Sequence, residues 1–173
     1  MLQASDTASP DTQQSHRAAW MALLARSPLD LLESNAAFAA RFDEHVLRHP
    51  ETGLMMVQGR VGGSGARFNL GEVTVTRCAV RLEATDATDA TESVGVSYVL
   101  GRSRRKAHLA ALCDAMLQIP NLYPILETSL LNPIRQYLAE AADTRTARAA
   151  STKVDFFTVA REAGPTGAAG GLA

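Results

Sequence analysis

The spacing of apolar residues predicts helices towards both ends of the chain. Apolar residues recur at helical spacing in residues 16–26 and again in residues 28–42. A wider apolar stripe in residues 104–118 is broad enough to lie across a sheet. After a short apolar piece at residues 122–131, a last helix is expected to run to about Ala150. The chain therefore has an N-terminal helix pair and C-terminal helices on either side of a region without helical periodicity.

Three serine or asparagine residues predict where helices begin. Ser15 can cap the first helix, because its side chain can accept a bond from a free backbone N–H group. Ser27-Pro28 and Asn132-Pro133 add a proline, whose fixed φ suits the first helical position. We therefore expect Ser27 and Asn132 to be the N-caps of the second and the last helix.

The central region is typical of antiparallel strands. Residues 43–49 form a short connecting strand that ends at Pro50. Residues 51–82 contain two extended runs that meet at a glycine-rich tip, and a third run at residues 73–82. Residues 94–102 alternate between apolar and small side chains and give a fourth strand. A helix pair, an antiparallel β-meander with its hairpin, and C-terminal helices packed on that sheet make an α+β domain.

The glycine-rich tip is Gly62-Gly63-Ser64-Gly65. We interpret Gly63-Ser64 as a two-residue turn, since glycine supplies the positive φ that a tight hairpin needs. A four-residue loop over residues 62–65 would leave the strand pairs beyond it unchanged. The tip lacks the Gly-Lys-Ser/Thr ending of a phosphate-binding loop, and Ser64 lacks the strand-to-helix turn of a nucleophile elbow. A structural turn is the favoured interpretation.

The tip fixes the register of the hairpin. It pairs Arg60 with Arg67, Gly59 with Phe68, and Gln58 with Asn69. Phe68 is then placed to cover the bare backbone at Gly59. Like charges directly opposite each other destabilise a hairpin unless something neutralises them. Arg60 and Arg67 are therefore predicted to share an anion, which can be a carboxylate or a phosphate.

Two further groups of residues are candidate binding sites. Arg102 and Arg104 belong to a basic cluster at the start of the predicted helix 104–118, where an anion would relieve the unfavourable meeting of positive charge and helix dipole. A solvated basic face explains the same cluster. Phe156 and Phe157 stand outside any periodic element, so they either fold back on the sheet or dock a partner.

Composition excludes several classes of function. The formal net charge is −1 at pH 7, which gives no footprint for nucleic acid. Cys78 and Cys113 are isolated, and the four histidines have no metal-ligand spacing, so no metal site is expected. No stretch has the apolar length of a membrane span or the layout of a signal peptide, and a cytoplasmic location is expected. Nothing brings a nucleophile, a base and an orienting group together.

The chain divides into one domain and two tails. Residues 1–14 are polar and expected to be disordered, residues 15–162 form the single α+β domain, and residues 163–173 form a flexible glycine- and alanine-rich tail. The repeated triplets of residues 84–92, ATDATDATE, are interpreted as a solvated loop insertion.

Four stretches resemble a known family, the PhnG subunit of bacterial carbon–phosphorus lyase. They are HRAAWMALLARS, ETGLMMVQGRVGGSGARFNLGEVTVTRCAVRL, GVSYVLGRSRRKAHLAALCDAML and STKVDFFTVARE. The resemblance implies a core complex with PhnH, PhnI and PhnJ subunits, helped by ATP-binding-cassette-type subunits. That complex displaces adenine from ATP with an alkylphosphonate, giving α-D-ribose 1-methylphosphonate 5-triphosphate from methylphosphonate.

The resemblance also implies a division of labour. Glycosyl transfer is ascribed mainly to PhnI, whereas S-adenosylmethionine and an iron–sulfur cluster belong to PhnJ, so no cofactor is expected on this chain. The chain would be an obligate subunit that shapes the transfer site, or a purely structural one that positions PhnI without touching substrate. No catalytic residue is assigned. Arg60, Arg67, Arg102 and Arg104 are the candidate phosphate-binding residues, and Phe156 and Phe157 the candidate docking residues.

Overall fold

The computed structural model describes residues 10–85 and 92–153 and confirms the α+β class. Helices precede and follow a single three-stranded antiparallel sheet in the order β1-β2-β3. The elements are α1 (Pro10–Arg26), α2 (Leu29–Ala36), η1 (Ala37–Arg41), β1 (Phe42–Arg60), η2 (Val61–Gly63), β2 (Arg67–Ala84), β3 (Glu92–Leu100), α3 (Arg104–Leu117), α4 (Tyr123–Leu126), η3 (Glu127–Leu131) and α5 (Asn132–Ser151).

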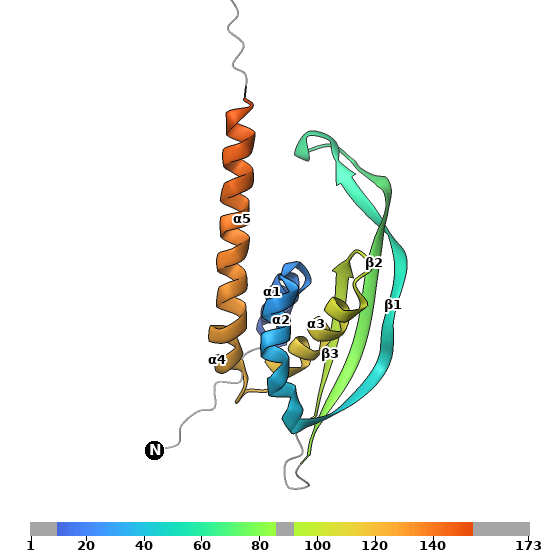
Figure 1. Cartoon of the computed structure of the whole chain (residues 1–173). Coiled ribbons are helices and arrows are strands. Elements are labelled where there is room, and N and C mark those ends of the chain that lie inside the picture. Colours follow the sequence, from blue (N-terminus) through green and yellow to red (C-terminus); the bar gives the residue numbers. More distant parts are fainter. Residues whose placement is uncertain (1–9, 86–91, 154–173) are drawn as a thin grey trace, which may run out of the picture.

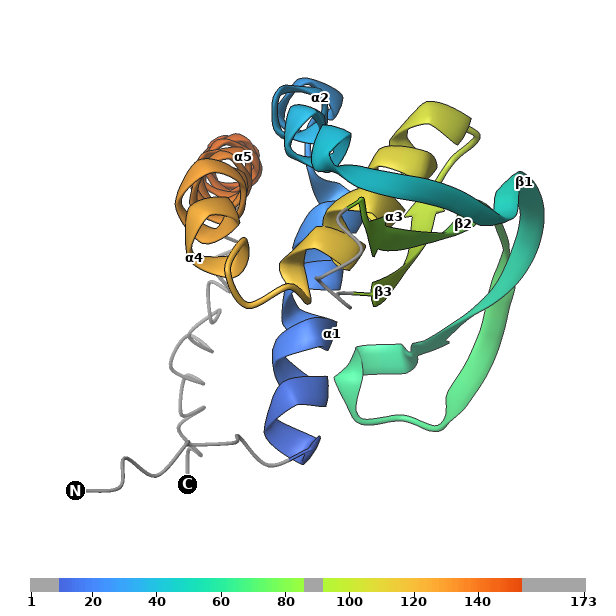
Figure 2. The ribbon, with the colours of Figure 1, turned by 90° about the horizontal axis from the view of Figure 1, so that it is seen from below.

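The elements form layers that begin at the sheet. Helix α3 lies directly on β2 and β3, and α1 and α2 pack on α3 (Figure 1). Helix α5 lies on the far side of α1 from the sheet, as the view from below also shows (Figure 2). The core consists mostly of leucines and alanines between these layers, with α3 at its centre.

Two long strands replace the shorter runs expected from the sequence. Strand β1 continues through Pro50 instead of ending there, and β2 continues through Gly71. Proline is tolerated because β1 is an edge strand, and the register shifts on both sides of Arg48, next to Pro50. Gly71, with φ at 149°, adjoins a second register shift between Val57 and Gln58. Pro50 and Gly71, at which the sequence suggested that strands end, instead lie beside bulges within continuous strands.

The expected helix starts were partly wrong. Helix α1 begins at Pro10, so Ser15 lies within it. Pro28 is the N-cap of α2, while the Ser27 hydroxyl donates instead to the Leu24 carbonyl at 2.8 Å. Asn132 does not begin a new helix, because α4, η3 and α5 form one continuous helix. Of the three predicted helix starts, only the one at Ser27-Pro28 lies at an observed helix start. There the N-cap is Pro28 and not Ser27.

A π-helical turn carries this helix past Pro133. Proline has no N–H group to give to the carbonyl of Ser129, four residues earlier. The buried Asn35 of α2 supplies the missing donor, since its amide nitrogen lies 3.3 Å from that carbonyl. The Ser129 hydroxyl in turn donates to the Asn35 side-chain oxygen at 2.7 Å. The η3 turn, Glu127–Leu131, is thus fastened to the N-terminal helix pair.

Strand β3 turns its small residues towards the helices. Ser93, Gly95 and Ser97 are buried, whereas the larger Val94 and Tyr98 are exposed on the opposite face. The missing side chain at Gly95 lets α3 approach the strand closely: an ideal Cβ there would lie 2.0 Å from the Ala111 carbonyl oxygen. Close packing of α3 therefore depends on a glycine at this position.

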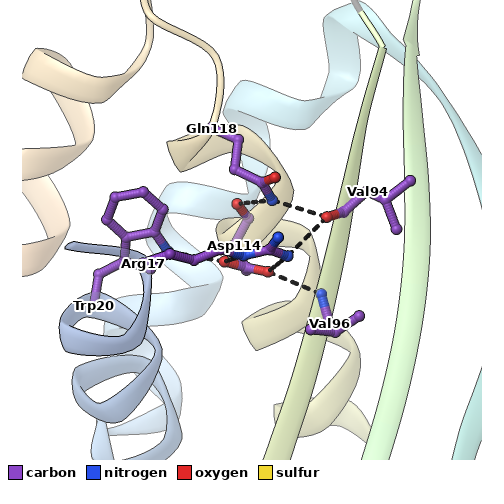
Figure 3. A network of polar contacts seen from close by, with 6 residues as sticks. All are labelled: Arg17, Trp20, Val94, Val96, Asp114 and Gln118. Carbon is purple, nitrogen blue, oxygen red and sulfur yellow. Dashed lines mark hydrogen bonds and ion pairs between the residues drawn. The ribbon is translucent and has the colours of Figure 1, made fainter. Parts of the chain in front are cut away.

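A buried carboxylate joins α1, α3 and β3 (Figure 3). Asp114 of α3 has no exposed surface and accepts bonds from the Arg17 guanidinium at 2.7 Å, the Trp20 indole N–H at 2.8 Å and the Val96 backbone N–H at 2.9 Å. The Gln118 amide links the Asp114 carbonyl to that of Val94. Two of the donors come from α1 and the third from β3, so the carboxylate ties both elements to α3.

Replacing Asp114 should destabilise the fold strongly. In Asp114→Ala the Trp20 and Val96 N–H groups lose their acceptor and Arg17 loses its counter-ion, so we expect a loss of about 3 kcal/mol in the free energy of unfolding. Urea denaturation followed by circular dichroism measures it. Asp143→Ala, at an exposed position of α5, is the matched control and should change stability by less than about 0.5 kcal/mol. Equal effects of the two substitutions would contradict a structural role for Asp114.

A methyl group at Gly95 should push α3 away from the sheet. The added carbon would meet backbone atoms, which cannot rotate away, so Gly95→Ala is expected to cost about 3 kcal/mol or more of stability. Gly53→Ala on β1 is the control, because nothing lies within 4 Å of a Cβ there. Thermal unfolding of the two variants should separate them clearly, and a native-like melting temperature for Gly95→Ala would refute the close packing.

Candidate functional site

The β1–β2 hairpin extends well beyond the third strand. Strand β3 pairs with β2 only as far as Val75 opposite Leu100, so residues 53–74, here called the distal arm, form a two-stranded ribbon with a loop at its end. Figure 1 shows the arm rising past α3 and bending towards the side on which the helices lie. Two-stranded ribbons are marginally stable alone, so an arm of this kind suits contact with another molecule.

The tip of the arm is wider than predicted. Strand pairing ends at Arg60 and Arg67, and Val61–Gly63 form one turn of 3₁₀-helix, so Val61 does not pair with Ala66 and the two-residue turn was wrong. Gly62 and Gly63 adopt φ values of 60° and 78°, which confirms the need for glycine. The Gly65 N–H closes the loop on the Val61 carbonyl at 3.1 Å. The pairs beyond the tip have the predicted register.

Arg60 and Arg67 face each other in the observed register, as expected. Both are exposed, and no residue in the described parts of the chain forms an ion pair with either guanidinium. Next to them the Gln58 amide donates to the Asn69 side-chain oxygen at 3.2 Å. Gln58, Gly59 and the two arginines line a shallow hollow of about 300 Å³. The structure brings these polar side chains together at the end of the arm.

Leu70, and not Phe68, covers Gly59. The Leu70 side chain lies so close to the Gly59 backbone that an added Cβ would be 2.6 Å from it. Phe68 faces Gly59 in register but is 44% exposed. The bulge at Leu70, where Gln58 pairs with Asn69 and Val57 with Gly71, explains the difference: it brings the leucine over the glycine.

Apolar residues of the arm are unusually exposed. Leu54 is 68% exposed and Leu70 63%, values typical of charged rather than apolar side chains. Exposed apolar residues continue onto the sheet face away from the helices. The exposed apolar residues of the arm and this face are Leu54, Met55, Met56, Val61, Phe68, Leu70, Val94, Tyr98 and Leu100. So many large apolar side chains exposed on one part of a molecule are the usual mark of a protein interface.

Arg102 and Arg104 are not part of the same site. Helix α3 begins at Arg104 with Ser103 as its N-cap, and the Gly101 N–H bonds to the Thr74 carbonyl at the base of the arm. Thr74 is seven residues from Arg67 along β2, so about 23 Å of extended strand lies between the base of the arm and the arginine at its tip. In the same cluster Arg105 is paired with Glu33, and burial lowers the pKa of Lys106.

The described residues contain no arrangement typical of catalysis. No group of three or more potential metal ligands occurs among them. Both cysteines are buried, and burial, together with the nearby Asp114 carboxylate, raises the pKa of Cys113 to about 12, so its thiol stays protonated and unreactive. Burial also raises the pKa of Cys78. The rings of His45 and His108 lie against the carboxylates of Glu83 and Glu44.

Sequence reasoning missed a hollow of about 550 Å³ beside the Asp114 network. It is lined by Gln14, His16, Arg17, Trp20, Leu117, Gln118 and Tyr123. Arg17 and Gln118 already bond to the Asp114 network, and the Trp20 and Tyr123 rings pack on each other with centroids 5.8 Å apart. The sequence did contain one signal of this network. Asp114 lies between Cys113 and Met116 on an otherwise apolar stripe, which indicates a buried charge that needs hydrogen-bond donors.

Two predictions concern residues that the structure does not describe. Phe156 and Phe157 fall outside the described residues, as does most of the ATDATDATE segment. Among the helices that the structure describes, none combines the length and apolar character needed to span a bilayer.

Comparison with known proteins shows the family to which the chain belongs. Residues 15–162 match the family described as phosphonate metabolism protein PhnG. A relative from Rhizobium meliloti (strain 1021), the α-D-ribose 1-methylphosphonate 5-triphosphate synthase subunit PhnG, is 40% identical over 165 residues, which cover 93% of this chain and 98% of the relative. The family match and the full-length similarity both include the distal arm and the Asp114 network. The chain therefore belongs to the PhnG family of phosphonate metabolism proteins.

Proposed function

We propose that this chain is a subunit of the synthase that forms α-D-ribose 1-methylphosphonate 5-triphosphate from ATP and methylphosphonate, with loss of adenine. The synthase subunit from Rhizobium meliloti, which aligns with this chain over nearly the whole of both proteins, supports this assignment. The absence of a nucleophile–base arrangement among the described residues supports a subunit that works with partners. We expect the partners to be PhnI, PhnH and PhnJ with ATP-binding-cassette-type subunits, in the cytoplasm, with any cofactor held elsewhere in the complex.

The observation that carries the proposal is the uncovered distal arm. Its two strands have neighbours on only one side, and apolar side chains such as Leu54 and Leu70 lie open to solvent. Burying them against a partner would be favourable by about 25 cal/mol for each Å² removed from water. We therefore infer that the arm docks on a partner subunit, for which PhnI is our first choice, and that the chain functions only within the complex.

A purely structural subunit is the second candidate. It would hold PhnI in place through the same arm and touch no substrate. The exposed apolar surface favours both versions equally, whereas the unpaired arginines at the tip favour a subunit that also contacts an anionic ligand. Kinetic measurements on the assembled complex, described with the further inference below, separate the two.

The chain should be required but not sufficient for adenine release. The purified chain, incubated with ATP and methylphosphonate, is expected to release no adenine above background, because its residues 10–85 and 92–153 hold no catalytic arrangement. Adding it back to the other subunits should restore formation of the triphosphate product, followed by chromatography of adenine and ³¹P spectroscopy. Full activity of the partner subunits without the chain, or turnover by the chain alone, would contradict the proposal.

Polar substitutions on the arm should weaken assembly without unfolding the chain. Leu54→Ser with Met56→Ser removes apolar surface that is 68% and 49% exposed in the free chain, so stability should change little. We expect at least a tenfold weaker association with the partner subunits, measured by affinity co-purification and analytical ultracentrifugation.

The matched control changes exposed apolar residues on the helical side of the molecule. Ile125→Ser with Tyr137→Ser alters side chains that are 45% and 48% exposed on α4 and α5, and association should stay at the wild-type level. If the arm variant assembles as well as this control, the arm is not the docking surface.

A further inference from the structure

We propose that Arg60 and Arg67 form a binding site for a tetrahedral phosphate or phosphonate group at the end of the distal arm. The proposal rests on the proposed function for the source of that group, which would be a substrate of the complex. The site itself rests on the geometry of the hairpin: the observed register places Arg60 directly opposite Arg67, and both side chains line the same hollow.

Elsewhere on the sheet, cross-strand arginines meet carboxylates. Arg77 stands opposite Glu51, with 2.7 Å between its Nε and the carboxylate. Arg81 lies 3.7 Å from Glu92 of the neighbouring strand β3, and 2.8 Å from Glu83 of its own strand. These pairs satisfy the rule that opposite charges stabilise neighbouring strands. The end of the arm breaks this rule, because an arginine is matched there with an arginine and no carboxylate of the described residues neutralises the pair.

The hydrogen-bonding groups around the pair are chiefly donors. Each guanidinium offers several N–H groups in a planar fork that binds phosphate oxygens in a bidentate manner. The Asn69 side-chain oxygen accepts the bond from Gln58, so the two N–H groups of the Asn69 amide are not used in that bond. They lie on the same side of the ribbon as Arg67. A ligand with several acceptor oxygens fits such a surface better than one with a single acceptor.

Charge and size favour a phosphate-type group over a carboxylate. Two guanidinium groups carry two positive charges, which one carboxylate neutralises only by half, whereas a phosphonate or terminal phosphate carries close to two negative charges near neutral pH. The hollow of about 300 Å³ beside Gln58 and Gly59 has room for such a group.

The arm holds the pair in place and brings it to the partner. The Gln58–Asn69 bond and the Leu70 side chain packed over Gly59 fix the ribbon just before the arginines. Exposed apolar residues line the ribbon on the way to the tip. When these are buried against a partner, water is excluded around the arginines and their attraction for an anion strengthens. The site is therefore complete in the assembled complex.

The test replaces both arginines within the complex. Arg60→Gln with Arg67→Gln is co-produced with the partner subunits, the mass of the assembly is measured, and adenine release is followed at varied ATP and methylphosphonate concentrations. We expect the complex to assemble normally and the KM for at least one of the two substrates to rise tenfold or more. Arg26→Gln with Arg41→Gln, which removes two exposed arginines elsewhere, should leave both KM values unchanged.

Two outcomes overturn the proposal. An intact complex with wild-type KM values means that the pair binds no substrate group. A complex that fails to assemble with the glutamine variant but assembles with wild-type KM values when both arginines are replaced by lysine means that the pair meets a carboxylate of a partner. Lysine variants that assemble with a raised KM support the proposal, since lysine keeps the charge but lacks the bidentate fork. Activity of the partner subunits without this chain would instead overturn the proposed function.

Discussion

Burying a carboxylate without matching donors is among the most costly arrangements in a protein, and Asp114 therefore dictates how the core of this molecule is assembled. Its two oxygens accept bonds from a guanidinium and an indole of α1 and from the backbone of β3. The three elements must be in place together for the charge to be tolerated. Residues as distant in sequence as Arg17 and Asp114 are held 2.7 Å apart by this one requirement. The same bonds occupy Val94 and Val96 on the outer side of β3, so they also close part of a sheet edge that would otherwise be free to pair.

The molecule thus combines a core that is held by specific polar contacts with a distal arm whose side chains are largely exposed. Around Asp114, Asn35 and Gly95, polar groups have partners and backbones are in close contact. Along the distal arm, apolar residues lie in solvent and two like charges face each other. Both features of the arm are unfavourable in the free chain: the apolar side chains gain when a partner covers them, and the facing arginines gain when an anion binds between them. This contrast is the physical basis for treating the chain as part of a larger assembly.

Local pattern was sufficient for the fold class, the helix 104–118 and the pairing of Arg60 with Arg67, because each depends on periodicity or on a turn within a few residues. Local pattern failed at Pro50, Gly71 and Pro133, where long-range context accommodates a residue that usually ends an element. At Pro133 that context is a single amide, Asn35, almost a hundred positions away. Asp114 was missed for the same reason: its donors are recruited by tertiary contact. The separation of Arg102 from Arg60 likewise follows from the length of β2, which no local signal revealed.

The connection between β2 and β3 joins strand ends at Ala84 and Glu92, whereas the arm leaves the sheet at its other end. Antiparallel order thereby places these two strand ends at the opposite pole of the sheet from the arginine-bearing tip. The residues that set the register of β1 against β2, and those that hold Asp114, all lie outside the connection between the two ends. An affinity tag or fluorophore inserted between Ala84 and Glu92 would therefore enter the chain at the end of the sheet away from the arm.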